Sequence, residues 1–210
     1  MTGIARIETA GPERRARRIV FDDGAEPRIT SAAVVKSLGL EVGVSVDPTT
    51  LEQALHGCEY DLAKERALQL LGYRERSSAE LVLKLDNTGY PHDISVAVMR
   101  RFVEVELVDD TRFASVWVRS RRAAGYGARR IARELHEKGV DGQLVEAVLE
   151  QGGEGADQLQ AARAALRGRV PRDRAEYNRL VRRLVSRGFE LSVALEAVGR
   201  PRAADANEDE

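Results

Sequence analysis

Apolar residues recur along the chain at intervals of three and four, a pattern that predicts a mainly helical protein. A longer pattern is also present. Two apolar residues four positions apart are followed, after four more positions, by a glycine and directly after it by another apolar residue. The three copies are Leu81, Leu85, Gly89 and Tyr90; Ile131, Leu135, Gly139 and Val140; and Leu180, Leu184, Gly188 and Phe189. They lie about 50 residues apart, and a period of this length predicts tandem copies of one structural unit.

Each copy reads as helix, turn, helix, glycine turn and helix. The apolar pair marks one face of a helix, and the glycine can take the left-handed conformation that ends it. The upstream helix of each copy is expected at residues 62–71, 113–122 and 159–166. Ser77 is the expected N-cap in copy one, with Glu80 reaching back to it. In copy two, Asp110 is the expected cap of the upstream helix and Gly125 its stop. We expect each unit to complete its core by stacking on its neighbours.

The first sixty residues follow a different pattern. Residues 18–21 and 27–30 read as two strands of a β-hairpin, and the turn between them contains Gly24. Ser31 can cap a short helix that Gly39 ends. Asp47 then opens a second short helix. Residues 1–16 are polar and rich in arginine, so we expect them to be disordered.

The predicted fold is therefore mainly α, with three tandem three-helix, helix-turn-helix-like repeats in an elongated array. A small N-terminal extension of β-hairpin and helices precedes them and is expected to pack on them. The expected segments are a disordered N-terminus (1–16), the hairpin with its short helices (17–58), repeat 1 (59–108), repeat 2 (109–153), repeat 3 (154–199) and a disordered acidic tail (200–210).

Composition leads to expectations about the surroundings of the protein. The single cysteine, Cys58, excludes an internal disulfide and suits a reducing compartment. The N-terminal residues do not resemble a signal peptide, and no apolar run is long enough for a membrane span. We expect a cytoplasmic protein without a membrane partner, and nothing in the sequence requires more than a monomer.

No group of residues predicts catalysis. His56, His92 and His136 are scattered, and no serine occurs in the setting of a known nucleophile. Residues 125–127 contain two glycines but lack the rest of a phosphate-binding loop, so a turn between helices explains them better. Asp109 and Asp110 are better explained as helix caps than as metal ligands. We therefore predict no catalytic residue, no metal, no cofactor and no enzyme activity.

Charge is the informative feature. The formal net charge is only -1, yet arginines are concentrated in the second and third copies, where acidic residues are fewer. Because the planar guanidinium group binds phosphate and carboxylate groups well, we predict a surface for an anionic partner there. The alternative is an ordinary solvated helix face. The candidate residues are Arg112, Arg119, Arg121, Arg122, Arg129, Arg130, Arg133, Lys138, Arg179, Arg182, Arg183 and Arg187.

These motifs resemble a known family, the RecX recombination regulators. Residues 74–81 together with Gly89 and Tyr90 resemble the first repeat of that family. Residues 108–114 resemble its Asp-Asp-x-x-Phe-Ala element, and the segments from Arg119 to Val140 resemble its second repeat. Residues 187–189 resemble the Arg-Gly-Phe of its third repeat. The resemblance covers about residues 60–199, but residues 105–108 depart from the usual glycine and aromatic, and the third repeat matches only in its later helices.

The resemblance implies a protein that binds the filament of the RecA recombinase and modulates, mainly by inhibition, its assembly, ATP hydrolysis and strand exchange. It places the protein in homologous recombination, DNA repair and the SOS response, and it implies contact with single- or double-stranded DNA. The alternative is a stand-alone DNA-binding protein of the helix-turn-helix type. The downstream helices carry few base-reading side chains, Gln143 and Gln151 among them, which favours the first interpretation.

Overall fold

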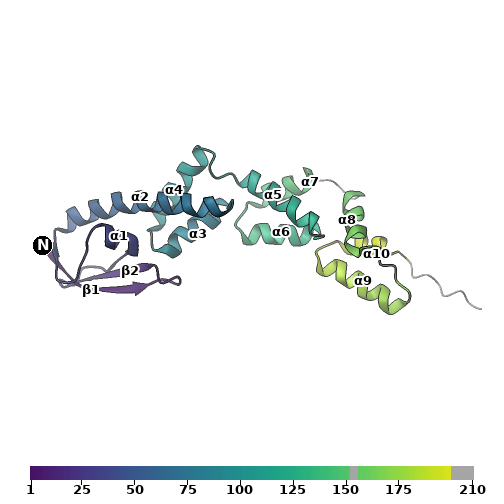
Figure 1. The fold of residues 1–210 in the computed structure, drawn as a ribbon, viewed down its shortest axis with the longest axis horizontal. Coiled ribbons are helices and arrows are strands. Elements are labelled where there is room, and N and C mark those ends of the chain that lie inside the picture. Colours follow the sequence, from purple (N-terminus) through teal and green to yellow (C-terminus); the bar gives the residue numbers. More distant parts are fainter. Residues whose placement is uncertain (152–155, 200–210) are drawn as a thin grey trace, which may run out of the picture. The chain divides into compact units, whose positions relative to one another are not determined.

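The computed structural model describes residues 1–151 and 156–199, and the chain divides into two compact units between Asp109 and Asp110. Unit 1 comprises residues 1–109 and contains the N-terminal extension and repeat 1 (Figure 1). Unit 2 begins at residue 110 and contains repeats 2 and 3. Within the described residues the fold is mainly helical with a small N-terminal sheet, as predicted. The predicted acidic tail, residues 200–210, lies outside the described residues.

The N-terminal sheet has four antiparallel strands in the order β3-β2-β1-β4. Its strands are β1 (Thr2–Ala10), β2 (Ala16–Phe21), β3 (Arg28–Ser31) and β4 (Ser45–Val46). The predicted hairpin is confirmed, because β2 pairs with β3. The prediction that residues 1–16 are disordered is wrong, since most of them form β1. A register shift between Ile4 and Arg6 interrupts the alternation of buried and exposed residues that would have marked the strand.

A short helix and a long one follow the sheet. In α1 (Ala32–Ser37), the hydroxyl of Ser31 accepts a hydrogen bond from the Val34 amide, as its predicted cap role requires. Two predicted helices merge in α2 (Pro48–Tyr73), which is continuous for 26 residues. The domain boundary predicted between residues 58 and 59 therefore falls inside a helix.

One continuous stripe of buried residues explains why α2 does not break. Buried side chains recur at three- and four-residue intervals along its whole length, at Leu51, Leu55, Glu59, Ala63, Ala67 and Leu70. Gly57, in the middle, costs a helix only about 1 kcal/mol relative to alanine. The stripe covers the sheet with its first half and repeat 1 with its second half, so the extension and repeat 1 share a core.

The three copies have the predicted helices. Repeat 1 continues after α2 with α3 (Ser78–Thr88) and α4 (His92–Glu104). Repeat 2 consists of α5 (Asp110–Ala123), α6 (Ala128–Glu137) and α7 (Gly142–Gln151), and repeat 3 of α8 (Ala156–Leu166), α9 (Arg174–Ser186) and α10 (Leu191–Val198). The apolar pairs of the pattern are buried in every copy, and each glycine at the turn has a positive φ.

The helix caps follow the predictions in part. The Ser77 hydroxyl accepts a hydrogen bond from the Glu80 amide, as predicted for α3. The carboxylate of Glu80 pairs with Arg74 and Arg76. Asp110 is the first residue of α5 rather than the residue before it, and Gly125, with φ +78°, follows the end of that helix.

Repeats 2 and 3 have separate cores, which corrects the expectation that stacking completes them. One apolar cluster lies within repeat 2 around Ile131 and Leu135, and another within repeat 3 around Leu180 and Leu184. The two repeats meet through their backbones instead. The Gly127 amide donates to the Arg187 carbonyl at 2.9 Å, and the Arg129 amide donates to the Gly188 carbonyl at 3.1 Å.

Glycine is required where these backbones meet. A Cβ atom at Gly127 would lie 2.4 Å from the carbonyl group of Gly188, and one at Gly188 would lie 2.4 Å from the amide nitrogen of Arg130. Such distances are too short for any side chain. The predicted turn glycine of repeat 3 therefore also serves as the contact point with repeat 2.

Candidate binding surface

The three histidines lie apart from one another, and within the described residues only one of them contacts a carboxylate. His56 and His136 are exposed, and His92 lies 2.9 Å from a carboxylate oxygen of Asp86 through its Nδ1. Among the described residues, no group of three or more His, Cys, Asp and Glu side chains could hold a metal ion. No helix in this part of the chain is long and apolar enough to cross a membrane.

Two of the candidate arginines are held by one carboxylate. Glu134, on α6, accepts hydrogen bonds from the Nε atoms of Arg121 at 2.7 Å and Arg130 at 3.1 Å. It also accepts one from the indole Nε1 of Trp117 at 3.1 Å. The Arg130 guanidinium lies 4.3 Å from the ring centre of Tyr126, and that of Arg121 lies 4.4 Å from the ring centre of Trp117. We call these five residues the Glu134 cluster.

The protonation of Glu134 follows from this arrangement. Burial alone would raise the pKa of its carboxyl group, but the hydrogen bonds from Arg130 and Arg121 and the charge of Arg121 lower it below its usual value. Glu134 is therefore a carboxylate at neutral pH, and its negative charge offsets the two guanidinium charges. Arg121 and Arg130 thus connect α5 to α6, in addition to any role at the surface.

Three other candidates also make contacts inside unit 2. The ammonium of Lys138 lies 4.4 Å from the ring centre of Trp117. Arg122 donates from Nη2 to the Leu149 carbonyl at 2.9 Å, and Arg187 donates from Nη1 to the Gly125 carbonyl at 3.3 Å. The last of these bonds links repeat 3 to repeat 2.

Three candidates form exposed ion pairs. Arg129 lies 3.4 Å from Glu190, Arg133 lies 3.8 Å from Glu137, and Arg179 lies 3.1 Å from Glu176. Pairs of this kind stabilise a protein by roughly 0–1 kcal/mol, because water and salt screen them. Their arginines are therefore readily available to another anion.

The remaining candidates differ in their surroundings. Arg112 is exposed in the first turn of α5. Arg119 is also exposed and lines, together with Arg122, a shallow hollow of about 370 Å³ between α5 and α7. Arg182 is exposed and donates from Nε to the Asn178 carbonyl at 3.3 Å.

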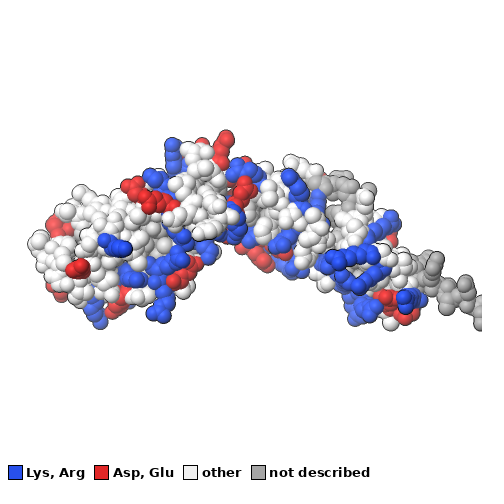
Figure 2. Space-filling view, in the orientation of Figure 1, with Lys and Arg blue, Asp and Glu red and all other residues white. Residues whose placement is uncertain are grey.

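Arg183 belongs to a group that the sequence prediction identified only in part. Dehydration and the positive charges of Arg187, Arg169 and Arg167 lower the pKa of its guanidinium group. Arg167 and Arg169 were not among the candidates. They lie in the loop between α8 and α9, and the density of arginine from residue 163 onward was the signal that could have found them. Figure 2 shows a dense group of basic side chains over α9.

The structure thus divides the predicted surface. Arg121, Arg130 and Lys138 are half-buried and lie over aromatic rings in repeat 2, whereas Arg129, Arg133 and Arg179 are exposed. Sequence spacing alone could not separate these classes, because Arg121, Arg122, Arg129 and Arg187 have partners far away in the sequence.

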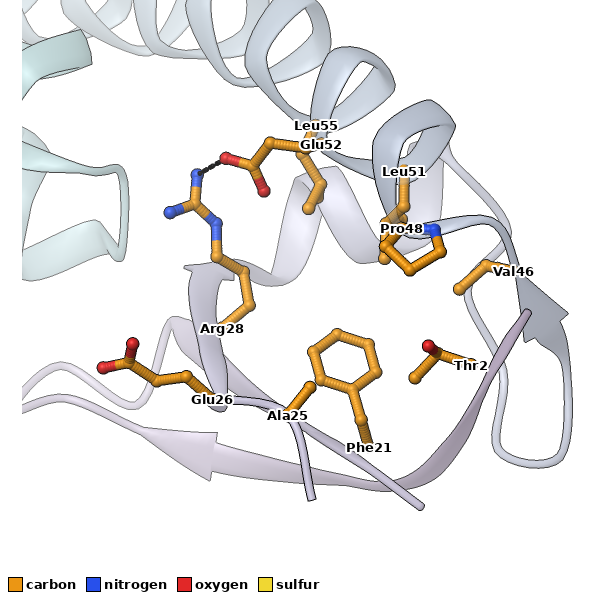
Figure 3. A pocket seen from close by; sticks show the side chains of 10 residues that line it. All are labelled: Thr2, Phe21, Ala25, Glu26, Arg28, Val46, Pro48, Leu51, Glu52 and Leu55. Carbon is orange, nitrogen blue, oxygen red and sulfur yellow. Dashed lines mark ion pairs between the residues drawn. The ribbon is translucent and has the colours of Figure 1, made fainter. Parts of the chain in front are cut away.

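Unit 1 contains a small pocket at the start of α2 (Figure 3). Its volume is about 140 Å³, and its lining includes Phe21, Val46, Leu51 and Leu55. At its rim, Arg28 pairs with Glu52 at 3.2 Å. Arg28 also reaches Glu59, which accepts a hydrogen bond of 2.6 Å from the Thr30 hydroxyl. Arg28 is thus paired with side chains of α2, and several lining residues of the pocket belong to the core of unit 1.

Two parts of the chain match domains of one family. Residues 63–102 match the first three-helix domain of RecX, and residues 109–149 match its second three-helix domain. The first range covers the second part of α2, all of α3 and most of α4, and the second covers α5, α6 and most of α7.

Curated relatives extend this match over most of the chain. The regulatory protein RecX of Mycolicibacterium vanbaalenii is 42% identical over 147 residues, which cover 65% of this chain and 80% of the relative. For RecX of Mycolicibacterium smegmatis the identity is 38% over 162 residues, covering 72% and 81%. For RecX of Mycobacterium tuberculosis it is 42% over 152 residues, covering 68% and 87%.

Solved structures show the same fold at lower identity. A crystal structure of regulatory protein RecX superposes with a TM-score of 0.58 at 21% identity, covering 92% of this chain and 97% of the other. The crystal structure of RecX from Lactobacillus salivarius gives a TM-score of 0.59 at 20% identity, covering 67% and 94%.

Proposed function

Because this chain belongs to the RecX family of regulatory proteins, we propose that it binds the RecA recombinase filament and restrains its assembly, ATP hydrolysis and strand exchange. The observation that carries the proposal is identity of about 40% to curated RecX proteins over most of both chains. The protein would act in recombination and DNA repair, in the cytoplasm where RecA works.

The basic surface of unit 2 is the proposed contact region. Its exposed pairs, such as Arg129 with Glu190 and Arg133 with Glu137, can exchange an intramolecular carboxylate for one on a partner at little cost. Each such contact is weak. Several contacts on linked repeats gain from a high effective concentration, so a surface spread over two repeats suits a partner that is itself a repeating filament.

The alternative is a stand-alone DNA-binding protein, since three-helix units also occur in helix-turn-helix readers. Sequence-specific readers use side chains such as Asn and Gln on the helix that enters the major groove. In α7 only Gln143 and Gln151 are of this kind, and α10 has none. This composition favours a protein partner or contact with phosphates over sequence reading.

The ATPase activity of RecA separates the two functions. RecA from the same organism is assayed on single-stranded DNA while the chain is titrated in, and binding to naked DNA is measured by gel shift over a salt series. We expect ATP hydrolysis to fall in a saturable manner. Unchanged hydrolysis together with tight, sequence-specific DNA binding would favour the alternative.

The contact region is tested by reversing two exposed charges. The variant Arg129→Glu with Arg133→Glu should require roughly tenfold more protein for half-inhibition, because rim charges contribute modest amounts each. The matched control is Lys64→Glu with Arg101→Glu in unit 1, where both cations also form exposed pairs with an acid three residues away. If both variants inhibit equally well, the Arg129 face is an ordinary solvated surface.

A further inference from the structure

A hollow rich in arginine lies in unit 1, where the N-terminal extension meets repeat 1. Its volume is about 440 Å³, and residues of the β1–β2 loop, the start of α1, the middle of α2 and the end of α3 surround it. The arginines that line it are Arg14, Arg15, Arg17 and Arg66, and the one acidic residue in its described lining is Glu65. Four positive charges thus face one negative charge. We call this site the basic hollow.

The Arg17 guanidinium is held in place while part of it stays available. Its Nη1 atom donates to the Ala16 carbonyl at 2.9 Å and to the Arg14 carbonyl at 3.2 Å. Within the described residues, no partner is recorded for its Nε and Nη2 atoms. These two nitrogens form one edge of the guanidinium and can donate to two oxygens of the same phosphate group. Because the side chain is already held, binding would cost little conformational entropy.

Arg66, on α2, presents the same edge. Its Nη1 atom lies 3.4 Å from the side-chain oxygen of Gln69. Its Nε atom is buried and, among the described residues, has no hydrogen-bond partner. Because a buried N–H group without an acceptor costs free energy, such donors are rare in folded proteins. An anion in the basic hollow would supply the missing acceptor.

The acids near the hollow do not neutralise it. Glu13, in the β1–β2 loop, is already paired with Lys84 at 2.9 Å and lies 3.8 Å from Arg15. In the described part of the chain, no ion pair is recorded for Arg14, Arg17 or Arg66. These three cations are therefore available to an anion from outside the chain.

We propose that the basic hollow binds a small molecule that carries two linked phosphate groups. Arg17 and Arg66 each offer one phosphate-binding edge, and Arg14 adds a further cation. Leu62 and Ala33 add apolar surface to the lining, against which an organic part of the ligand can lie. The site belongs to unit 1, so it does not rest on the contact with RecA proposed for unit 2.

The arrangement favours a small phosphate ligand over a nucleic acid or a carboxylate. A polymer backbone is usually bound by basic residues spread along a face or a helix. Here the cations come from a loop, a strand and a helix and line one hollow, whose volume lies within the roughly 300–1,000 Å³ of small-molecule sites. Phosphate is favoured because each group carries up to about two negative charges, whereas a carboxylate carries one.

The test follows the Nε–H signal of Arg66 by NMR in the full chain labelled with nitrogen-15. The signal is assigned by its absence from the spectrum of Arg66→Gln. Pyrophosphate, ADP, citrate and a thymidine 30-mer are titrated separately in magnesium-free buffer. Because this N–H belongs to the lining of the hollow, it reports binding there and not at the arginines of unit 2.

Two neighbours on β2 provide the variant and its matched control. Adjacent residues of a strand point to opposite faces, and Arg17 lines the hollow whereas Arg18 is exposed outside it. Arg17→Gln should weaken binding of both diphosphates roughly tenfold or more, because charge-assisted hydrogen bonds are lost. Arg18→Gln should bind like the unchanged chain. If the amide spectrum shows that Arg17→Gln is unfolded, Arg14→Gln, in an exposed loop, replaces it with the same expectation.

We expect the Arg66 signal to shift in a saturable manner, with a dissociation constant below about 1 mM for pyrophosphate. ADP should bind more tightly, because its organic part also contacts the apolar lining. A signal that moves with neither diphosphate would overturn the proposal, as would equal binding by the Arg17 and Arg18 variants. So would tighter binding of citrate or of the thymidine 30-mer, since these results assign the hollow to a carboxylate or a nucleic acid. RecA is absent from the assay, so failure here leaves the proposed regulation of RecA standing.

Discussion

At the scale of the residue, the pKa values of two glutamate side chains are shifted in opposite directions by their surroundings. Glu134 lies among two guanidinium groups and an indole N–H, which keep its pKa low. Glu59 is fully buried under the N-terminal sheet with Thr30 and Arg28, and burial raises its pKa. The first residue therefore strengthens unit 2 when ionised, and the second weakens unit 1 when ionised.

Removing the charge of Glu134 should destabilise unit 2. In Glu134→Gln, two guanidinium groups lose an ionised acceptor, which we expect to lower the free energy of unfolding at pH 7 by about 1–3 kcal/mol. Because the folded pKa is lowered, the contribution is present above the usual value of 4.5 and is lost as the pH falls through the folded pKa. The difference between variant and unchanged chain should therefore shrink in acid. Trp117, the only tryptophan, reports the transition by fluorescence. An equal difference at pH 7 and pH 3 would contradict the role given to this charge.

The opposite sign is expected for Glu59. Its raised pKa means that the folded state binds the proton more tightly, so stability is highest below the usual value of 4.5 and falls as the pH rises through the folded pKa. In Glu59→Gln, an oxygen still accepts from Thr30, and Arg28 keeps its pair with Glu52. We expect the variant to be more stable than the unchanged chain at pH 8 by roughly 1 kcal/mol, with no gain at pH 4. Urea unfolding followed by circular dichroism measures both values. A net loss at pH 8 would mean that the pair with Arg28 outweighs burial.

At the scale of the element, the sequence predicted what local spacing determines. Helix ends at Gly89 and Gly188 and the cap at Ser77 depend on a few neighbouring residues, and the structure has them where expected. The prediction failed for β1, because the shift between Ile4 and Arg6 breaks its alternation. The sequence also predicted two helices where the structure has the single helix α2. A glycine in its middle does not end a helix whose stripe of buried residues continues on both sides.

The glycine turn of repeat 3 offers a test at this scale. Gly188 and Gly168 both have positive φ, at +91° and +73°. A Cβ atom at Gly168 meets nothing within 4 Å, whereas one at Gly188 clashes with the Arg130 backbone. Gly168→Ala should cost about 1–2 kcal/mol, because only the left-handed conformation opposes it. Gly188→Ala should cost more than about 3 kcal/mol, because it also separates the repeats. Thermal unfolding followed by circular dichroism compares them, and equal losses would refute close backbone contact between repeats 2 and 3.

At the scale of the whole molecule, the tandem organisation could be predicted from the sequence, but the partners of the individual arginines could not. Three copies of one spacing are visible in the sequence, and so is the excess of arginine in the second and third. Which arginines are already paired depends on contacts between separate elements, such as Arg121 with Glu134 and Arg129 with Glu190. The candidate surface could therefore be assigned to a region from the sequence but not resolved into individual contacts.

The central claim, that the chain recognises a RecA filament, also concerns the whole molecule. Co-sedimentation tests it most directly: RecA filaments formed on single-stranded DNA with a non-hydrolysable ATP analogue are pelleted in the presence of the chain. RecA is kept in excess so that the DNA is covered, and the same DNA coated with single-strand-binding protein serves as the control. We predict saturable recovery of the chain with RecA filaments and little recovery with the control. A chain that stays in the supernatant, or pellets equally with both, would contradict the account.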